Sequence, residues 1–221
     1  MTAISPDAGP HAGPRGDAGG SPAAYRLPPS CTDGGMTLRA ALTLRRSTRA
    51  YSDAPLSLQQ LSDLLWAACG VNRAGGERTA PYWRHRIVLS VFVLQPDGVT
   101  VYDPVEHALT PYMKGDFRAL AGEQDFVGRA PLELVYVARG EKMADITAIE
   151  RQLYASVDAA FIGQNVYLFC ASAGLATVFR GALDKDGLAR ALHLPDTDFV
   201  TFAQTVGFSD EKPPDSQGKS P

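Results

Sequence analysis

The sequence contains few cysteines and no strong excess of either charge. Its three cysteines, Cys31, Cys69 and Cys170, lie far apart and form no CxxC motif. An odd number of distant cysteines indicates reduced thiols instead of a disulfide framework, as is typical of a cytosolic protein. The formal net charge of the 221 residues is −3, so overall charge attracts the chain neither to nucleic acid nor to an anionic membrane.

Other sequence signatures of binding are also absent. No run approaches the ~20 consecutive apolar residues that cross a bilayer. The four histidines fit no zinc or metalloprotease spacing, so we expect no metal site. No Gly-x-Gly-x-x-Gly follows a predicted strand, which argues against a separate dinucleotide-binding domain. We therefore expect a small-molecule ligand, and no nucleic acid or membrane partner.

The composition predicts one globular domain between two loose ends. Residues 1–33 are rich in Pro, Gly, Ala, Ser and Asp, and such a segment buries too little apolar surface to offset its ordering entropy. Residues 209–221 read SDEKPPDSQGKSP, which indicates a second flexible tail. The domain is therefore expected at residues 34–208.

Periodicity and capping signals predict alternating helices and strands in this domain. Ser57 and Gln60 have capping-box spacing, and leucines then recur at helical intervals until Gly70. A shorter helix is expected at residues 37–44. Runs rich in Val, Ile, Leu and Phe predict four strands, at residues 87–94, 99–102, 131–138 and 199–207.

A long helix is predicted from about Ile146 to Ala173. No charged residue follows Asp158 until Arg180, and large apolar side chains fall on every side of the helix. A helix that is apolar all round must be buried all round. In a domain of this size, this pattern predicts a sheet on one side of the helix and a second subunit on the other.

The first candidate site is a basic segment at the end of the first helix. Three arginines and two hydroxyl side chains lie within five residues: Arg45, Arg46, Ser47, Thr48 and Arg49. Guanidinium groups match phosphate oxygens in geometry, and serine adds a short donor. Taken alone, however, the segment is equally consistent with a solvated basic turn.

Residues 45–51 resemble the phosphate-binding opening of the nitroreductase family, in which Arg-x-Ser-x-Arg/Lys precedes an aromatic residue. Here that aromatic residue is Tyr51. Further segments follow in the family's order, at residues 56–73, 102–109 and 124–131. The resemblance covers about residues 36–208 and is strongest to a subgroup that includes the azoline-oxidising dehydrogenases of peptide maturation.

The resemblance implies an α+β fold, with a central, mainly antiparallel mixed sheet wrapped by helices. It also implies an intertwined homodimer with two FMN sites at the subunit interface. Arg45, Ser47 and Arg49 would then hold the FMN phosphate and ribityl chain. Arg46 is included among the cofactor-binding candidates, although family members vary at this position.

The second candidate site is the segment from Ala173 to Asp184. From the residues alone it is a helix-capping glycine, a short strand-like run and a turn. The resemblance implies that backbone N–H groups near Arg180 and Gly181 face the reactive N5 atom of the flavin. A fixed donor there stabilises negative charge without titrating, and glycine permits close approach of the backbone.

The third candidate site departs from the family pattern. Residues 78–81, ending at Pro81, resemble the family's approach to the flavin, which continues Ser-x-x-Asn and then Gln. This chain has Tyr82, His85 and Ile87 at those three positions. Either Tyr82 or Trp83 stacks near the flavin while His85 replaces Asn as a donor, or an aromatic, basic loop closes over an empty pocket.

Together these features predict an FMN-dependent oxidoreductase of the nitroreductase type. NAD(P)H or an organic substrate would exchange a hydride with an acceptor through flavin N5, and no side chain is expected to act as a catalytic acid or base. The alternative is a catalytically silent scaffold or partner subunit that has lost the flavin. A flavin carrier that does not react with nicotinamide donors is a third hypothesis.

Overall fold

A seven-stranded sheet forms the centre of the computed structural model, which describes residues 23–211. The strand order is β1-β4-β3-β2-β5-β7-β6, and all six pairings are antiparallel. The strands are β1 (Tyr25–Arg26), β2 (Leu89–Gln95), β3 (Gly98–Asp103), β4 (Ala108–Lys114), β5 (Leu132–Ala138), β6 (Ala176–Arg180) and β7 (Phe199–Gly207). The α+β fold with a central, mainly antiparallel sheet is confirmed, and within residues 23–211 every strand pairing is antiparallel.

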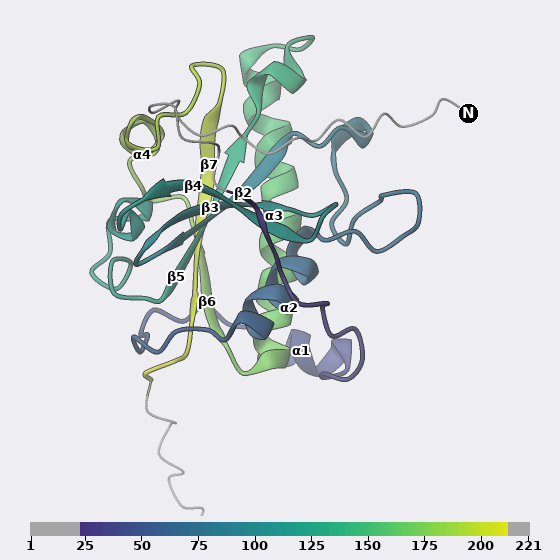
Figure 1. Ribbon diagram of the computed structural model, residues 1–221, viewed down its shortest axis with the longest axis vertical. Helices are drawn as coiled ribbons and strands as arrows, with labels where there is room; N and C mark the ends of the chain where they lie inside the picture. The colour runs from purple at the N-terminus through teal and green to yellow at the C-terminus, as the bar shows by residue number, and fades with distance from the viewer. Residues whose placement is uncertain (1–22, 212–221) are drawn as a thin grey trace, which may run out of the picture.

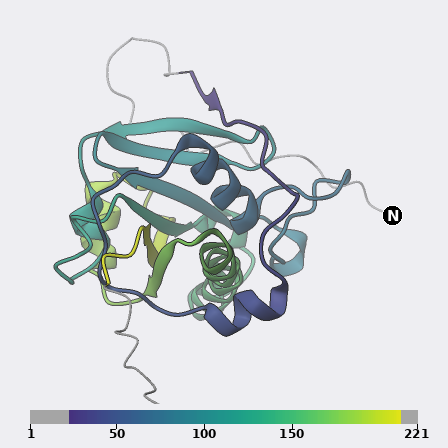
Figure 2. The same ribbon diagram turned by 90° about the horizontal axis from the view of Figure 1, so that it is seen from below.

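Helices cover both faces of this sheet. Helices α1 (Leu38–Leu44), α2 (Leu58–Cys69) and α3 (Ala148–Ala173) lie together on one side, and α4 (Lys185–Ala191) lies on the other (Figures 1 and 2). Short 3-10 turns are η1 (Trp83–His85), η2 (Arg118–Ala121) and η3 (Gly140–Met143). None of the helices in residues 23–211 is both long and apolar enough to cross a membrane.

The central strands are buried on both faces because their side chains alternate between two cores. In β2, Val91 and Val93 pack with α2 and α3, whereas Phe92 and Leu94 pack with the core beneath α4. Side chains of a strand point alternately to opposite faces. A strand that is covered twice therefore has the nearly continuous apolar run that predicted β2 and β5.

Helix α3 is the predicted long helix and begins and ends at capping signals. Thr147 and Glu150 form a capping box at its start, and Gly174 ends it in the left-handed conformation at φ 69°. Its core-facing side contains Ala155, Ala159, Ile162, Val166 and Cys170. A second side is exposed in the single chain: Ile149, Leu153, Val157 and Phe161 recur at every fourth position. These four residues are called the α3 stripe below.

The N-terminal boundary differs from the expectation. Residues 1–22 lie outside the described part of the chain, but β1 pairs with β4, and Leu27 is buried in the core. The hydroxyl of Ser62 donates to the Pro28 carbonyl at 2.6 Å, and the Cys31 N–H donates to Asp63 at 2.7 Å. The segment from residue 23 to 33 therefore belongs to the domain. Main-chain pairing at a sheet edge depends little on composition, which is why the sequence did not reveal it.

Two further elements were not predicted, namely β4 and α4. Pro111 lies within β4 beside the point where its register with β3 shifts, between Val99 and Thr100. Proline within a strand normally argues against a central strand, but it is accommodated at a bulge. Helix α4 is only seven residues long and is interrupted by Gly187, so its helical signal is weak.

Candidate functional site

The basic segment at residues 45–51 lies where α1, α3 and β6 meet. The Ser47 hydroxyl is 2.7 Å from the Tyr167 hydroxyl of α3. The same Tyr167 oxygen accepts the Phe179 N–H of β6 at 3.0 Å. The guanidinium of Arg45 lies over the Tyr167 ring, 5.0 Å from its centroid. Tyr167 thus connects the segment to the strand that ends at Arg180.

The backbone of this segment is fixed, while most of its polar side chains remain exposed. The Thr48 N–H donates to the Thr177 carbonyl of β6 at 3.0 Å, and the Tyr51 hydroxyl donates to the Thr48 carbonyl. Thr48 itself is buried. Arg46, Ser47 and Arg49 are exposed. The segment therefore presents donors on a backbone that is already held in place.

A cavity of about 310 Å³ lies beside the segment. Among its lining residues are Arg46, Thr48, Tyr167 and Thr177. Arg46 also forms an ion pair with Glu211 at 3.4 Å. Small-molecule sites begin at roughly 300 Å³. Guanidinium and hydroxyl donors next to a cavity of this size fit the phosphate end of a flavin nucleotide.

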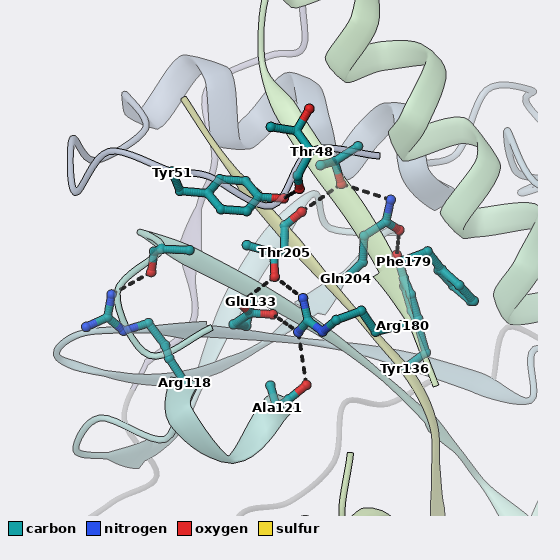
Figure 3. Close-up of polar contacts among 12 residues, drawn as sticks. Thr48, Tyr51, Arg118, Ala121, Glu133, Tyr136, Phe179, Arg180, Gln204 and Thr205 are labelled. Carbon is teal, nitrogen blue, oxygen red and sulfur yellow. Dashed lines mark hydrogen bonds and ion pairs between the residues drawn. The ribbon is translucent and has the colours of Figure 1, made fainter. Parts of the chain in front are cut away.

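The Arg180 side chain does not face this cavity but is buried within the sheet (Figure 3). Its Nη2 donates to Glu133 at 2.7 Å and to the Ala121 carbonyl at 2.9 Å, and its Nη1 donates to Thr205. Thr205 in turn donates to the other oxygen of Glu133 at 2.7 Å. The Arg180 guanidinium therefore joins β5, β6 and β7, and this side chain is not available to a ligand.

Burial controls the ionisation of this cluster. Loss of solvent raises the pKa of the Glu133 carboxyl to about 7, although the neighbouring Arg180 guanidinium acts in the opposite direction. Removing one partner of such a buried pair leaves an uncompensated charge. The cluster therefore holds the end of β6 in place, immediately before Gly181.

Gly181 follows β6 at an exposed position. A Cβ atom at this residue would lie 3.2 Å from the Phe202 ring, which is tighter than ordinary contact. The carbonyl of Gly181 accepts the Leu183 N–H at 3.1 Å. Glycine is therefore favoured here by the closeness of Phe202, and the backbone remains open on its exposed side.

The altered segment at residues 81–87 contacts α3 nearer to the start of the helix than segment 45–51 does. Both carboxylate oxygens of the buried Asp158 accept the Trp83 N–H, each at 3.1 Å. The Trp83 ring stacks on Tyr154 of α3, with centroids 5.0 Å apart. Trp83 is thus held against α3. Burial raises the pKa of the Asp158 carboxyl to about 6, opposed by the Trp83 hydrogen bond.

The tip of this segment has an unusual backbone. Arg84 and His85 have positive φ angles of 47° and 57°. Such angles are uncommon for residues other than glycine and occur often at functional sites. The His85 ring is exposed and lies edge-on to Tyr82, with centroids 6.3 Å apart. No hydrogen bond joins His85 to another residue in the described range.

The two segments do not meet within one chain. Segment 45–51 contacts α3 at Tyr167, and segment 81–87 contacts it at Asp158. Nine residues of helix separate these contacts by about 13 Å at 1.5 Å per residue. The structure therefore gathers Arg45 and Ser47 around Tyr167 and leaves Pro81, Tyr82 and His85 apart from them.

The sequence analysis did not single out Tyr167 and Asp158. Each was visible only as a polar side chain in an otherwise apolar part of the long helix. A buried polar side chain normally has a hydrogen-bond partner. The two polar residues in an apolar helix therefore predict buried hydrogen bonds, but the sequence does not identify the partners.

Comparison with protein families matches residues 42–208 to the Nitroreductase family. The chain belongs to this family. It is 31% identical over 171 residues to MJ1384 of Methanocaldococcus jannaschii, which is named as a nitroreductase, and the match covers 73% of this chain and 86% of that protein. The chain is therefore an oxidoreductase of the nitroreductase family.

Solved structures agree with this assignment. A crystal structure described as a nitroreductase from Ralstonia eutropha JMP134 is 39% identical, with a TM-score of 0.81, covering 93% of this chain and all of that one. Two more distant structures show the same fold. They are the Vibrio harveyi NADPH:FMN oxidoreductase with NAD+ (23% identity, TM-score 0.58, 80% and 72% covered) and the E. coli microcin synthetase McbBCD (18%, 0.66, 87% and 79%).

Proposed function

We propose that the protein is an FMN-dependent oxidoreductase that binds its cofactor through residues 45–51 and acts as a homodimer. The observation that carries this proposal is the hydrogen-bonded connection from Ser47 through Tyr167 to Phe179. It joins the expected phosphate site to β6, the strand expected to pass the flavin ring. A flavin nucleotide bound between these elements would have its phosphate and its ring positioned by one hydrogen-bonded connection.

The phosphate end would be held by charge-assisted hydrogen bonds. Arg45 is half-buried beside Tyr167, and Arg49 is exposed with no ion pair to any residue in the described range. Ser47 adds a hydroxyl donor between them. Arg46 adds positive charge from the cavity side. Arginine side chains that do not depend on a protein carboxylate are well suited to bind a ligand phosphate.

The reactive end would be served by the main chain after β6. When bound, FMN supplies a ring whose N5 atom accepts and donates a hydride. We propose that backbone N–H groups at Arg180 and Gly181 provide a fixed donor at that end. The buried pair of Arg180 with Glu133 holds the strand, so the donor needs no rearrangement.

The dimer proposal rests on the α3 stripe. Ile149 is 82% exposed, and the other three members are also exposed. A row of apolar side chains along a helix marks a surface that a partner covers. Because segment 81–87 lies beside the start of the stripe, we propose that Pro81, Tyr82 and His85 contact the flavin of the other subunit.

The dimer is tested by sedimentation of the full chain and of a variant with charge in the stripe. Val157→Arg should shift the protein from dimer to monomer at micromolar concentration, because an unpaired charge would be buried in the interface. Glu123→Arg, at an exposed position outside α3, is the matched control. A wild-type chain that sediments as a folded monomer would contradict the proposal.

The electron donor is proposed to be NAD(P)H, and the acceptor a small organic molecule. A distant structural neighbour is named as an NADPH:FMN oxidoreductase and was solved with NAD+, which supports this choice. The reverse reaction, oxidation of an organic substrate followed by reoxidation with oxygen, uses the same site. Anaerobic mixing with NADH, NADPH or neither, followed by air, separates the two directions.

The cofactor proposal is tested by absorption spectroscopy of the purified protein with and without added FMN. We expect flavin absorption that remains with the protein through gel filtration, and bleaching when a nicotinamide donor is added. A protein that binds FMN but is not bleached by either nicotinamide would be a flavin carrier or an enzyme with another donor. A colourless protein that cannot be loaded would contradict FMN binding.

A second candidate function is a scaffold that has kept the fold without the flavin. The altered residues Tyr82, His85 and Ile87 favour it, because bulk replaces a small residue where the ring is expected. Against it, Trp83 is stacked on α3, and residues 45–51 keep their exposed donors. Failure to bind FMN at millimolar concentration, in a protein that is folded and dimeric, would favour the scaffold.

A further inference from the structure

Arg78 is a buried arginine that forms no ion pair within residues 23–211. Arg78 is 7% exposed, and its Nε atom is buried with no hydrogen-bond partner. No ion pair or side-chain hydrogen bond joins its guanidinium to another residue of the described chain. Only its main chain is engaged, through a bridge to Val71 and a hydrogen bond from Arg73 to its carbonyl at 3.3 Å.

This arrangement is physically costly. A guanidinium does not lose its proton in a protein, so Arg78 cannot reduce the cost of burial by becoming neutral. Buried charges are normally paired or hydrogen-bonded for this reason. The buried thiol of Cys69 and the Tyr102 hydroxyl both interact electrostatically with Arg78, but burial raises the pKa values of both groups well above neutrality. Neither supplies a negative charge at physiological pH.

Arg78 lines two small cavities. The larger has a volume of about 30 Å³ and lies between the end of α2, strands β2 and β3, and η3. The smaller has a volume of about 20 Å³ and lies beneath Tyr82. A water needs roughly 10–15 Å³ by this measure, so the larger cavity accommodates about two waters or one small ion.

The larger cavity is the more electropositive of the two. Arg139 and Lys142 line it together with Arg78. Its one carboxylate belongs to Asp103, whose Oδ1 already accepts the N–H groups of Val105 and Glu106 at 2.9 and 3.2 Å. Arg139 is paired with Glu141 at 2.6 Å. The smaller cavity is lined by Asp158 and by no cation other than Arg78, so an anion is less favoured there.

We propose that Arg78 binds a small monovalent anion in the larger cavity, either a halide or the carboxylate end of a small acid. The anion would supply the ion-pair partner that Arg78 lacks among residues 23–211. Arg78 lies three residues before Pro81, so the anion would stabilise the start of the altered segment. None of residues 45–51 lines the larger cavity, and the tests below require no flavin.

The first test compares thermal unfolding of wild type, Arg78→Met and Arg190→Met. Methionine keeps much of the length of arginine without its charge, and Arg190 is an exposed arginine on α4. Each protein is heated in a buffer whose only anion is a bulky organic sulfonate, and again with bromide or formate at equal ionic strength. When the concentration of bromide or formate is about one hundred times its Kd, the Tm of wild type should rise by about 5–10 °C.

The variants should separate a binding site from a structural arginine. Arg190→Met should show the same rise as wild type, and Arg78→Met should show none. Without the small anion, Arg78→Met should be at least as stable as wild type, because it removes an uncompensated charge. A wild type that gains no stability from either anion, or an Arg78→Met that gains as much as wild type, would overturn the proposal.

Crystals of the wild type provide a second measurement that needs no variant. Bromide is a halide with a strong anomalous signal, and a peak within about 3.5 Å of the Arg78 guanidinium is expected. Crystals grown with formate distinguish the carboxylate source by a planar density at the same place. Bromide peaks confined to the surface, with only water beside Arg78 in both crystals, would overturn the proposal.

Discussion

The segments at residues 45–51 and 81–87 both contact α3, but they are held in different ways. Segment 45–51 is fixed by main-chain hydrogen bonds and by the hydroxyl of Tyr167, and Arg45 and Arg49 form no ion pair with any described residue. Segment 81–87 is fixed by the carboxyl of Asp158 and by stacking of Trp83, and its tip has two left-handed residues. Its conformation therefore depends on a titratable group.

This difference suggests different roles for the two segments: segment 45–51 binds the ligand, and segment 81–87 adjusts the shape of the site. A segment whose backbone is fixed and that carries arginines without an ion-pair partner is prepared for a charged ligand. A segment with strained backbone angles and a buried carboxyl can change its conformation at lower cost. We therefore expect changes in segment 45–51 to alter cofactor affinity, and changes near segment 81–87 to alter pH dependence and substrate preference.

The largest effect is expected from the arginines of segment 45–51. Arg45→Ala and Arg49→Ala each remove charge-assisted hydrogen bonds worth about 1.5–3 kcal/mol, so FMN affinity should fall by roughly 10- to 150-fold per variant. Stability should change little, because Arg49 is exposed and Arg45 is only half-buried. Fluorescence titration with FMN measures the dissociation constant of each variant.

Riboflavin provides the matched ligand for this prediction, because it lacks the phosphate. The affinity for riboflavin should be nearly unchanged in both variants. Arg190→Ala should change the affinity for neither FMN nor riboflavin. If FMN and riboflavin lost affinity equally, the arginines would not contact the phosphate. The comparison between the two segments would then fail at its first step.

The next effect is a pH dependence that arises at Asp158. Its folded pKa of about 6 is above the ordinary value of 3.8, so the folded state holds the proton more tightly. The associated stability is present below pH 3.8 and is lost as pH rises to about 6. A shift of this size corresponds to about 2–3 kcal/mol.

Asp158→Asn should remove this dependence while keeping an acceptor for the Trp83 N–H. Relative to wild type, the variant should gain about 2 kcal/mol of unfolding free energy between pH 4 and 7. Urea unfolding at several pH values measures the difference. Asp145→Asn, at an exposed carboxylate whose pKa is lowered by Arg86, should not show this gain. Parallel curves for wild type and Asp158→Asn would show that Asp158 does not control segment 81–87.

The sequence revealed most of the fold because its strongest signals are local. The capping boxes at Ser57 and Thr147 and the apolar run of β7 are each set by neighbouring residues. The contacts of the candidate site are not local. Ser47 is 120 positions from Tyr167, and Arg180 is 47 positions from Glu133. A single sequence gives no signal for such pairs.

The Arg180 side chain is a second case in which the contact partner is distant in sequence. The sequence predicts that main-chain N–H groups near Arg180 and Gly181 face the flavin, but it does not indicate what the Arg180 side chain contacts. In the structure its guanidinium is 4% exposed and pairs with a fully buried carboxylate. Whether an arginine faces a ligand or a buried partner depends on the strand that lies opposite it. That strand is distant in sequence.

A smaller effect is expected at Tyr167. Tyr167→Phe keeps the ring under Arg45 but removes the hydroxyl that joins Ser47 to the Phe179 N–H. The loss of these hydrogen bonds should cost about 1–2 kcal/mol and weaken FMN binding several-fold. Segment 81–87 should be unaffected, so the fluorescence of Trp83 should not change. Unchanged FMN affinity would show that the connection to β6 is not used by the ligand.

The smallest effect on affinity is expected when the altered segment is returned to the family pattern. In the double variant Tyr82→Ser with His85→Asn, asparagine suits the positive φ of position 85. Tyr82 is half-buried and contacts His85 edge-on, and Trp83 would keep its stack on Tyr154. We therefore expect FMN affinity within about threefold of wild type, or less than ~0.7 kcal/mol, and a clear change in the relative rates with different acceptors. A phenol ring beside the flavin either stacks on it or occupies its space. If the double variant binds FMN and the wild type does not, Tyr82 has closed the site, and the scaffold function replaces the enzyme.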